Sequence, residues 1–598
     1  MITRMIKYSL IIFQPELKPF LARVQELGMV DVRRENKAID NHSKELFGKV
    51  QRYSLIIKKL EDLRESLKDI KPSESSLKYN ENISETIDTI EKALDNRELW
   101  ISEEKALVRE LEDSKAWGSY NKDDIQKLEA LGYKLHFYVI SENNFNPEWE
   151  KEYLLQILNK VGGRYYFVIL SPVGSEFLFK NPESKFPQNS SDVVASRLEE
   201  TRRQIAVNSA DLAGYIQQII FLEKSLKEDN SSLDLYLAGT SSQTEAEGTL
   251  ALITGFAQRT HRSELKEFFD SENVYYIEED ALEEDNPPIK LKNNFFTRLF
   301  EPIGELYMLP KYGELDLTPY FAPFYMLFFG LCLGDMGYGL VLLLAGTIGK
   351  FKWPKFKGYL TLIQFLGIGA IIMPLLSGSI FGTKLSVIFS LPDSIDSLFF
   401  SDIKMFWFAI LFGIFQIVFA RLLNAIYSIA TKGWQYGMHN IGWSIVIIWA
   451  SLAYAKTMLP DMVIPSYVTY IGIFGAILIL FFSSTEGNIF SRLLKGTFAF
   501  YDITGVFGDM LSYIRLFGLG TSGGILGLVV NSIAMNMSSV PYVGWFFTGL
   551  MLIVGHTFVL LLSSLGAFVH PMRLTFVEFY KNSGFTGGGK AFRPLTKN

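Results

Sequence analysis

The sequence predicts a protein in two unlike halves: N-terminal α/β lobes joined by long charged helices, followed by an α-helical half that crosses a membrane several times. The first observation is compositional. Of 598 residues, 48% are hydrophobic, but charge is concentrated in residues 1–312, while 313–598 holds mostly apolar segments of membrane-spanning length. The second is helical periodicity over long charged segments of the first half. The third is an arginine, Arg515, inside the apolar stretch 508–535.

The N-terminal half alternates short α/β segments with long helical ones. The predicted strands are 7–13, 29–33, 133–140, 165–171, 250–256 and 274–277, and the predicted helices are 15–27, 35–117 (broken near Pro72), 148–161, 193–228 and 262–269. Two long helical segments that flank one globule predict an antiparallel coiled coil, 35–119 with 186–249, which carries a distal lobe at 120–185. The segments 1–34 and 250–312 then form a membrane-proximal lobe. A helical run of about 45 residues is about 70 Å long, which suits a strut.

The apolar half contains seven candidate spans: 317–349, 358–383, 405–429, 441–458, 465–482, 509–535 and 543–580. Read as one span, 317–349 would place Lys350–Lys357 and the basic C-terminal tail outside, against the positive-inside tendency. Its middle carries Gly334, Asp335 and Gly337, which are awkward in a straight helix. A hairpin turn there gives about eight transmembrane helices, the last two long and tilted.

This topology places both termini in the cytoplasm, and the acidic segment 392–402 and Asp461 outside. The alternative is a seven-span protein with one exceptional loop. No signal peptide is apparent, since only a short apolar run, 10–13, precedes Pro15. The predicted location is therefore a membrane, in a multi-pass arrangement, with the soluble half in the cytoplasm.

Arg515 is the most informative residue of the apolar half. A guanidinium at membrane depth costs roughly 3 kcal/mol on insertion scales, and arginine side chains stay charged in proteins. A group that never titrates cannot carry protons, so it must act on another charge. Asp509 lies about 9 Å along the same helix, and no carboxylate of this span is level with Arg515. We therefore expect its partner to be an acid on another chain.

The last apolar segment carries further polar side chains that are expensive at membrane depth unless they line water or face partners. They are His556, Ser563, Ser564, His570, Arg573 and Glu578. His556 has an equal alternative as a satisfied helix–helix contact, whereas His570 and Arg573 form an i,i+3 pair on one face. The glycines at 518–527 suit close helix packing or a smooth surface that another helix can pass.

Several site classes find no support in the sequence. One cysteine excludes an intramolecular disulfide framework, and six scattered histidines without an HExxH motif argue against a metal site. The tail segment 584–591 resembles a P-loop, but Ala591 replaces the Ser/Thr that holds magnesium and no strand precedes it. We predict a flexible tail, no nucleotide site, no metal and no cofactor.

Five segments together resemble the membrane stator subunit of rotary V/A-type ATPases, called subunit I in prokaryotes and subunit a in eukaryotes. They are PPIKLKN (287–293), LPKYGELDLTP (309–319), FFGLCLGDMGYG (328–339), DMLSYIRL (509–516) and GAFVHPMRL (566–574). The resemblance covers essentially the whole chain. It implies that Arg515 faces the ion-carrying carboxylate of a rotor ring, and that Arg573 lies on the neighbouring tilted helix. A glutamate of the eukaryotic members is absent, since Ser563 and Ser564 occupy its region.

The resemblance implies a non-catalytic subunit that forms two ion half-channels against the rotor proteolipid ring (c/K subunits). Its expected partners also include peripheral-stalk subunits of E/G type, a central-stalk cap subunit of d/C type and the lipid bilayer of a prokaryotic plasma membrane, with no nucleic acid. A secondary transporter with a regulatory coil would instead predict an inverted repeat, and none is apparent. A pure scaffold would leave Arg515 unexplained. Neither the ion, proton or sodium, nor the direction of ATP chemistry follows from these residues.

Overall fold

The computed structural model describes residues 1–597 except 35–36, 74–75, 77–82, 119, 175–176, 246–247, 273, 390–391, 393–395, 459–464, 485–488 and 540–541. Asp461 and part of the segment 392–402 therefore lie outside the described residues. The contacts divide the chain into two compact units. One comprises Met1–Ile11, Met29–Val32 and Leu252–Pro594, and the other comprises Ile12–Gly28, Arg33–Ala251 and Leu595–Asn598.

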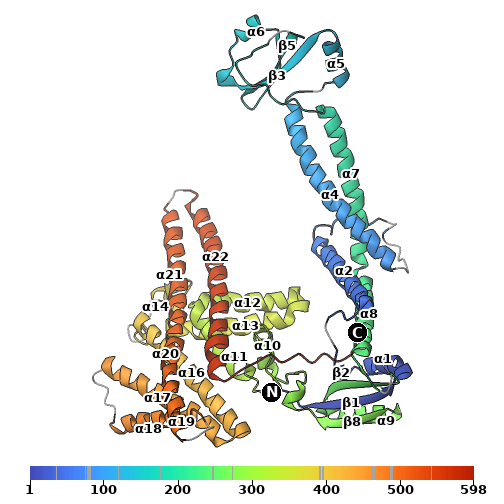
Figure 1. Cartoon of the computed structure of the whole chain (residues 1–598). Helices are drawn as coiled ribbons and strands as arrows, with labels where there is room; N and C mark the ends of the chain where they lie inside the picture. The colour runs from blue at the N-terminus through green and yellow to red at the C-terminus, as the bar shows by residue number, and fades with distance from the viewer. Residues whose placement is uncertain are drawn as a thin grey trace. The chain divides into compact units, whose positions relative to one another are not determined.

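The second unit is built on paired helices. Helix α4 (Ile83–Lys115) packs along α7 (Ser191–Gln217), and α2 (Asn41–Leu63) and α1 (Leu17–Leu27) pack on α8 (Ile219–Thr240). The start of α4 shares a buried cluster with the end of α7, whereas Leu107, late in α4, packs on Val194 and Leu198, early in α7. The two helices are therefore antiparallel, as Figure 1 shows for the α4–α7 pair.

A small lobe lies between α4 and α7 in the sequence and at their far end (Figure 1). It contains α5 (Lys122–Ala130), α6 (Trp149–Glu152) and an antiparallel sheet of order β3-β5-β4, with β3 at Tyr133–Ser141, β4 at Leu155–Val161 and β5 at Arg164–Pro172. The predicted helix 148–161 is wrong in its larger part, since only α6 is helical. The segment after it pairs with β5 through a turn at Gly162 and Gly163, both at positive φ.

The first unit begins with a sheet of path order β2-β7-β1-β8, with β1 at Met5–Phe13, β2 at Val30–Val32, β7 at Leu250–Gln258 and β8 at Tyr275–Asp280. A short strand, β6 (Gln243–Glu245), pairs with β7. β1 and β8 are antiparallel with Ser9 opposite Ile277, and helix α9 (Arg262–Ser271) places Phe269 against Tyr8, with ring centroids 5.3 Å apart. The predicted strand–helix–strand pattern of the segment 250–277 is present.

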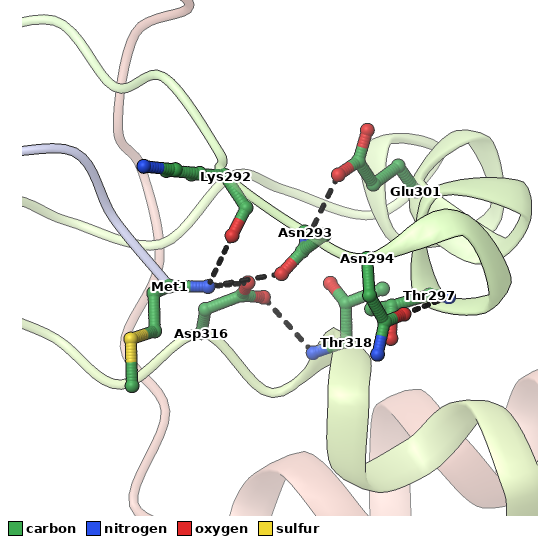
Figure 2. A network of polar contacts seen from close by, with 8 residues as sticks. All are labelled: Met1, Lys292, Asn293, Asn294, Thr297, Glu301, Asp316 and Thr318. Carbon is green, nitrogen blue, oxygen red and sulfur yellow. Dashed lines mark hydrogen bonds and ion pairs between the residues drawn. The ribbon is translucent and has the colours of Figure 1, made fainter.

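A polar network marks the passage from this lobe to the apolar helices (Figure 2). Asn294 caps helix α10 (Phe295–Glu305), and the Asp316 carboxylate accepts the Thr318 N–H at the start of α11 (3.0 Å). The buried Asp316 also binds the Met1 ammonium at 2.7 Å. The start of α11 is thus held by charged hydrogen bonds rather than by a loop alone.

The apolar helices of the first unit share one core. The helices and strands after α10 are α11 (Thr318–Leu333), α12 (Met336–Lys352), α13 (Lys357–Ile372), β9 (Ser379–Ile380), β10 (Thr383–Lys384), α14 (Leu385–Phe389), α16 (Asp402–Lys432), α17 (Trp434–Met458), α18 (Tyr467–Phe482), α19 (Ile489–Ala499), α20 (Ile503–Ser512), α21 (Ile514–Met537), α22 (Gly544–Arg573), the π-helix η8 (Leu574–Phe579) and α23 (Tyr580–Asn582). Phe321, Tyr325 and Phe328 of α11 are fully buried in this core. Helix α13 packs against both α11 and α12, and α21 packs along α22 (Figure 1).

Within the part of the chain that the structure describes, four helical segments are long and apolar enough to cross a membrane: Pro354–Leu376, Asp402–Lys432, Phe490–Met537 and Gly544–Asn582. Thr318–Leu333 and Tyr467–Phe482 are shorter and also apolar. The chain therefore has an α-helical half with several membrane-length helices. The predicted span 358–383 ends early: α13 stops at Ile372, a last helical turn that begins at Pro374 reaches Leu376, and residues 379–384 form the two-stranded turn β9–β10.

The glycine-rich tail is ordered, so the prediction of a flexible tail is wrong. The N–H groups of Gly588 and Gly589 both donate to the Leu309 carbonyl, at 3.0 and 3.1 Å. A Cβ at Gly589 would lie 2.0 Å from the Pro310 carbonyl oxygen. These glycines allow close backbone packing along residues 309–310.

Candidate functional site

Arg515 is the second residue of α21, directly after a break in the helix at Tyr513. Its side chain is half-buried, and its Nη1 nitrogen is buried with no hydrogen-bond partner. Among the described residues, no ion pair includes Arg515. Because the guanidinium is a permanent cation with five N–H donors, this nitrogen can still donate a hydrogen bond to a further acceptor.

Contacts with α16 stabilise the helix break beside Arg515. Tyr513 is fully buried, and its hydroxyl donates to Gln416 Oε1 at 2.7 Å. Its ring lies so close to α16 that a Cβ at Gly413 would come within 2.2 Å of it. The sequence analysis missed Gln416 and Gly413, since neither carries a sign of its distant partner.

The second helix of the site, α22, changes its geometry where its polar residues gather. Pro571 interrupts the backbone hydrogen bonding, and the π-helix η8 follows Arg573. π-turns inside helices recur at functional sites. His570 and Arg573 are three residues apart and share one face of α22, and the charges of both Arg573 and Arg515 act on His570. Arg573 itself is exposed.

Two buried acids lie on the tail side of Arg515, that is, on the side toward η8 and the C-terminal residues. Glu578 in η8 is 2% exposed, contacts the Ser512 hydroxyl and has one carboxylate oxygen, Oε2, without a hydrogen-bond partner. Asp509 in α20 accepts from Asn582 Nδ2 at 3.0 Å and pairs with Lys581 Nζ at 3.3 Å. Glu578 was a predicted site residue, whereas the structure adds Asp509 as its neighbour, since the two carboxylates act on each other.

On the other side of Arg515, toward the start of α22, one face of this helix is polar. His556, Ser563 and His570 are seven residues apart, which places them on one face, two turns from one to the next. Ser563 meets α21 at Gly523, where an added Cβ would lie 3.2 Å from the serine oxygen. The Ser564 oxygen is buried without a hydrogen-bond partner.

His556 ends this polar face and is the most highly connected of its members. Tyr338 of α12 lies 2.8 Å from its Nδ1, and Asn531 of α21 lies 2.9 Å from its Nε2. Neither Tyr338 nor Asn531 was singled out from the sequence.

The residues predicted to form a turn lie beside the helix of Arg515. Helix α11 ends with Gly334 at φ 66°, and Asp335 caps α12. A Cβ at Gly334 would lie 2.3 Å from the Gly520 carbonyl oxygen of α21, and one at Gly337 would meet the Phe381 ring at 2.7 Å. The break between α11 and α12 therefore packs on α21 one and a half turns from Arg515.

A second arginine in an apolar helix escaped the sequence analysis. Arg421 of α16 lies with its guanidinium carbon 5.2 Å from the centre of the Trp443 ring, a cation–π geometry. It feels the charges of Asp509 and Asp502. The available signal was simple: a single arginine inside the 31-residue helix Asp402–Lys432.

Comparisons with known proteins point in one direction, although no protein-family model matches the chain. V-type ATP synthase subunit I of Borreliella burgdorferi is 25% identical over 520 residues, covering 82% of this chain and 84% of the relative. A-type ATP synthase subunit I of Methanocaldococcus jannaschii is 25% identical over 600 residues, covering 86% and 84%. V-type ATP synthase subunit I of Chlamydia trachomatis is 23% identical and covers 97% of both chains.

A solved structure described as the cytoplasmic N-terminal domain of subunit I, homolog of subunit a, of V-ATPase covers 46% of this chain and 100% of its own, with 13% identity and a TM-score of 0.19. The sequence relatives come from bacteria and archaea, are named as subunit I of V-type or A-type ATP synthases, and each match at least 82% of this chain. Over most of its length the chain is therefore a homologue of V-type and A-type ATP synthase I subunits.

Proposed function

We propose that this chain is the stator subunit of a rotary V/A-type ATPase, and that Arg515 is the fixed charge against which the rotor ring exchanges its ion. The observation that supports this most directly is the buried Nη1 of Arg515, which has no acceptor among the described residues. A guanidinium left unpaired in an apolar half is costly. A carboxylate on a neighbouring rotor subunit supplies the missing acceptor.

The polar groups on both sides of Arg515 suit two separate half-channels. Glu578 and Asp509 lie on the tail side, and the face with Ser563, Ser564 and His556 runs the other way along α22. With one half-channel open to each side of the membrane, an ion can reach the rotor only through the ring. Arg515 blocks a direct path between the two, because its fixed positive charge repels a passing cation.

The mechanism follows from the charge. A rotor carboxylate that meets Arg515 releases its ion, because a nearby cation stabilises the anionic form. It reloads from the other half-channel and then turns through lipid as a neutral group. His570 and Arg573, which lie near Arg515, orient water and the carboxylate at this exchange point. ATP chemistry belongs to other subunits.

We assign the helical pairs of the soluble half to a coiled-coil strut that resists torque. The α4–α7 pair carries the distal lobe, and Asn189 donates to Glu110 at 3.0 Å, joining the two helix ends beneath it. The partners on this reading are peripheral-stalk subunits of E/G type at the lobe and a central-stalk cap subunit of d/C type. The domain division at residue 312, eight membrane crossings and both termini in the cytoplasm belong to the same proposal.

The test is ion transport by the intact complex in vesicles. Arg515→Gln should abolish ATP-driven ion uptake while the complex still assembles, and Arg515→Lys should fail largely because a compact ammonium lacks the planar fork of guanidinium. Arg421→Gln is the matched control: Arg421 also has a buried nitrogen without a hydrogen-bond partner, but its guanidinium lies over the Trp443 ring, so uptake per assembled complex should persist. Normal uptake with Arg515→Gln would refute the proposal.

A further inference from the structure

The turn β9–β10 is built around a buried carboxylate, Asp335, which is 0% exposed. Among the described ion pairs none includes it. Its two oxygens accept five hydrogen bonds: on Oδ1 from the N–H groups of Gly337 (2.8 Å), Tyr338 (3.2 Å) and Phe381 (2.8 Å), and on Oδ2 from the Gly382 N–H (2.7 Å) and the Ser379 hydroxyl (3.2 Å). Asp335 therefore fastens the turn to the start of α12 as well as capping that helix.

The β9–β10 turn also contacts α21 and α22. A Cβ at Gly382 would lie 2.3 Å from the Leu528 nitrogen, so the turn and α21 meet backbone to backbone. Phe381 adopts φ 46°, a left-handed conformation that is rare for an aromatic residue. Its ring stands edge-on to His556, with centroids 5.5 Å apart. The hydrogen bonds to Asp335 hold this strained residue in place.

The hydrogen bonds around His556 have a fixed direction. The Asn531 amide nitrogen lies 2.7 Å from the Phe381 carbonyl oxygen, which can only accept. The Asn531 oxygen therefore faces His556 Nε2 at 2.9 Å, so that nitrogen must carry the hydrogen. In neutral imidazole the other nitrogen, Nδ1, is then an acceptor, and Tyr338 donates its hydroxyl hydrogen to it at 2.8 Å.

This arrangement leaves one nitrogen able to take a proton without any heavy atom moving. The proton reaches Nδ1 through Tyr338: the hydroxyl passes its hydrogen to Nδ1 and takes another from hydronium, and its oxygen then accepts the new N–H. One N–H bond and one tyrosine O–H bond form, while the former tyrosine O–H bond and one hydronium O–H bond break, and release to water reverses the same steps. The charged group that acts on His556 is the Asp335 carboxylate, and Tyr338 is its titratable neighbour.

We propose that Asp335 is a positioning residue: through the β9–β10 turn and Asn531 it holds His556 in one tautomer as a proton-transfer station of the half-channel on that side of Arg515. This rests on the proposed function and names the proton as the ion. His556 lies 17 residues before Arg573, about 26 Å along the helix, so it serves the far end of the half-channel rather than the rotor contact.

The experiment measures ATP-driven uptake by the intact complex in vesicles, with a pH dye and a voltage dye, as a function of the pH inside. His556→Gln should lower both signals at least ten-fold. Thr557→Ala is the matched control on the same helix, because the Thr557 hydroxyl serves only the Ile553 carbonyl of its own helix. Asn531→Leu should lower uptake and shift its pH profile, since Nε2 loses the acceptor that fixes the tautomer.

Tyr338→Phe separates relay from scaffold, because it keeps the ring packing and removes only the hydroxyl. The protonated histidine then loses a charge-assisted hydrogen bond, so the pH of half-maximal uptake should fall. An unchanged pH profile in Tyr338→Phe, or normal uptake in His556→Gln, would overturn the inference. Loss of transport in Arg515→Gln together with normal transport in the His556 and Tyr338 variants would refute this inference alone and leave the proposed function standing.

Discussion

The hydrogen bond between Tyr513 and Gln416 offers a quantitative test of how the site is held. Tyr513→Phe removes the hydroxyl that Gln416 Oε1 accepts at 2.7 Å. Gln416 is completely buried and its Nε2 already has no partner, so the variant leaves the whole amide unsatisfied. Interhelical hydrogen bonds in membranes contribute about 0.6 kcal/mol on average and at most about 2. Because the amide cannot find another partner, we expect a loss near the upper end, about 1–2 kcal/mol.

Unfolding of the subunit in a detergent titration measures this loss, and ion uptake by the complex reports whether Arg515 has moved. The double variant Tyr513→Phe with Gln416→Leu removes both polar groups and should recover most of the stability, because an apolar pair leaves nothing unsatisfied. The coupling energy of this cycle should therefore approach the sum of the two single losses. Additive losses in the double variant would refute the reasoning.

Three further predictions concern the rest of the chain. Hydrogen bonds from Tyr236 and Ser43 lower the pKa of the Asp40 carboxyl from 3.8 to about 2. The stabilisation of α2 by the Asp40 carboxylate should therefore be complete above pH 4 and lost as the pH falls toward 2. Asp40→Ala should speed amide exchange at the start of α2 at neutral pH. A cysteine at Lys355, with Cys332→Ala, should resist an impermeant thiol reagent from outside if Lys350–Lys357 is cytoplasmic; ready labelling would restore the seven-span topology. Replacing residues 120–185 by a short linker should leave the membrane half folded but uncouple ATP hydrolysis from ion uptake, and tightly coupled uptake would contradict the strut.

The sequence predicted the helices and strands whose hydrophobic periodicity extends over a long continuous segment. Repeated apolar residues over the segments that became α2, α4, α7, α16 and α22 were sufficient for helices, and the alternation of residues 7–13 was sufficient for β1. The strand β4 was missed because its apolar residues Leu155, Ile157 and Leu158, together with Leu154 before it, also fit a helical period. The decisive signal was the pair Gly162–Gly163, a two-residue hairpin turn that fixes the segments on both sides as strands.

The residues of the candidate site also fall into those that the sequence predicted and those that it did not. Arg515, Arg573 and His570 stand out from the sequence because charge in an apolar segment is costly wherever it lies. Their supports do not stand out, since Tyr513 and Gln416 are 97 residues apart and Tyr338 and His556 are 218 apart. Asp335 was noticed as a poor fit to a straight helix, but its bonds to the β9–β10 turn arise from tertiary packing, which no periodicity encodes.

Asp335 and Arg515, two charged residues of the apolar half, differ in how their charges are satisfied. Asp335 is completely enclosed and accepts five hydrogen bonds from its own chain, so its negative charge needs no partner and serves to fix a turn. Arg515 has a buried nitrogen with no acceptor, although Glu578 and Asp509 lie on the same side of the site. A buried charge left unpaired destabilises the chain that carries it, so its cost is offset only when another molecule supplies an anion. On the proposed function, a rotor carboxylate supplies that anion, and Arg515 acts on a group of another subunit.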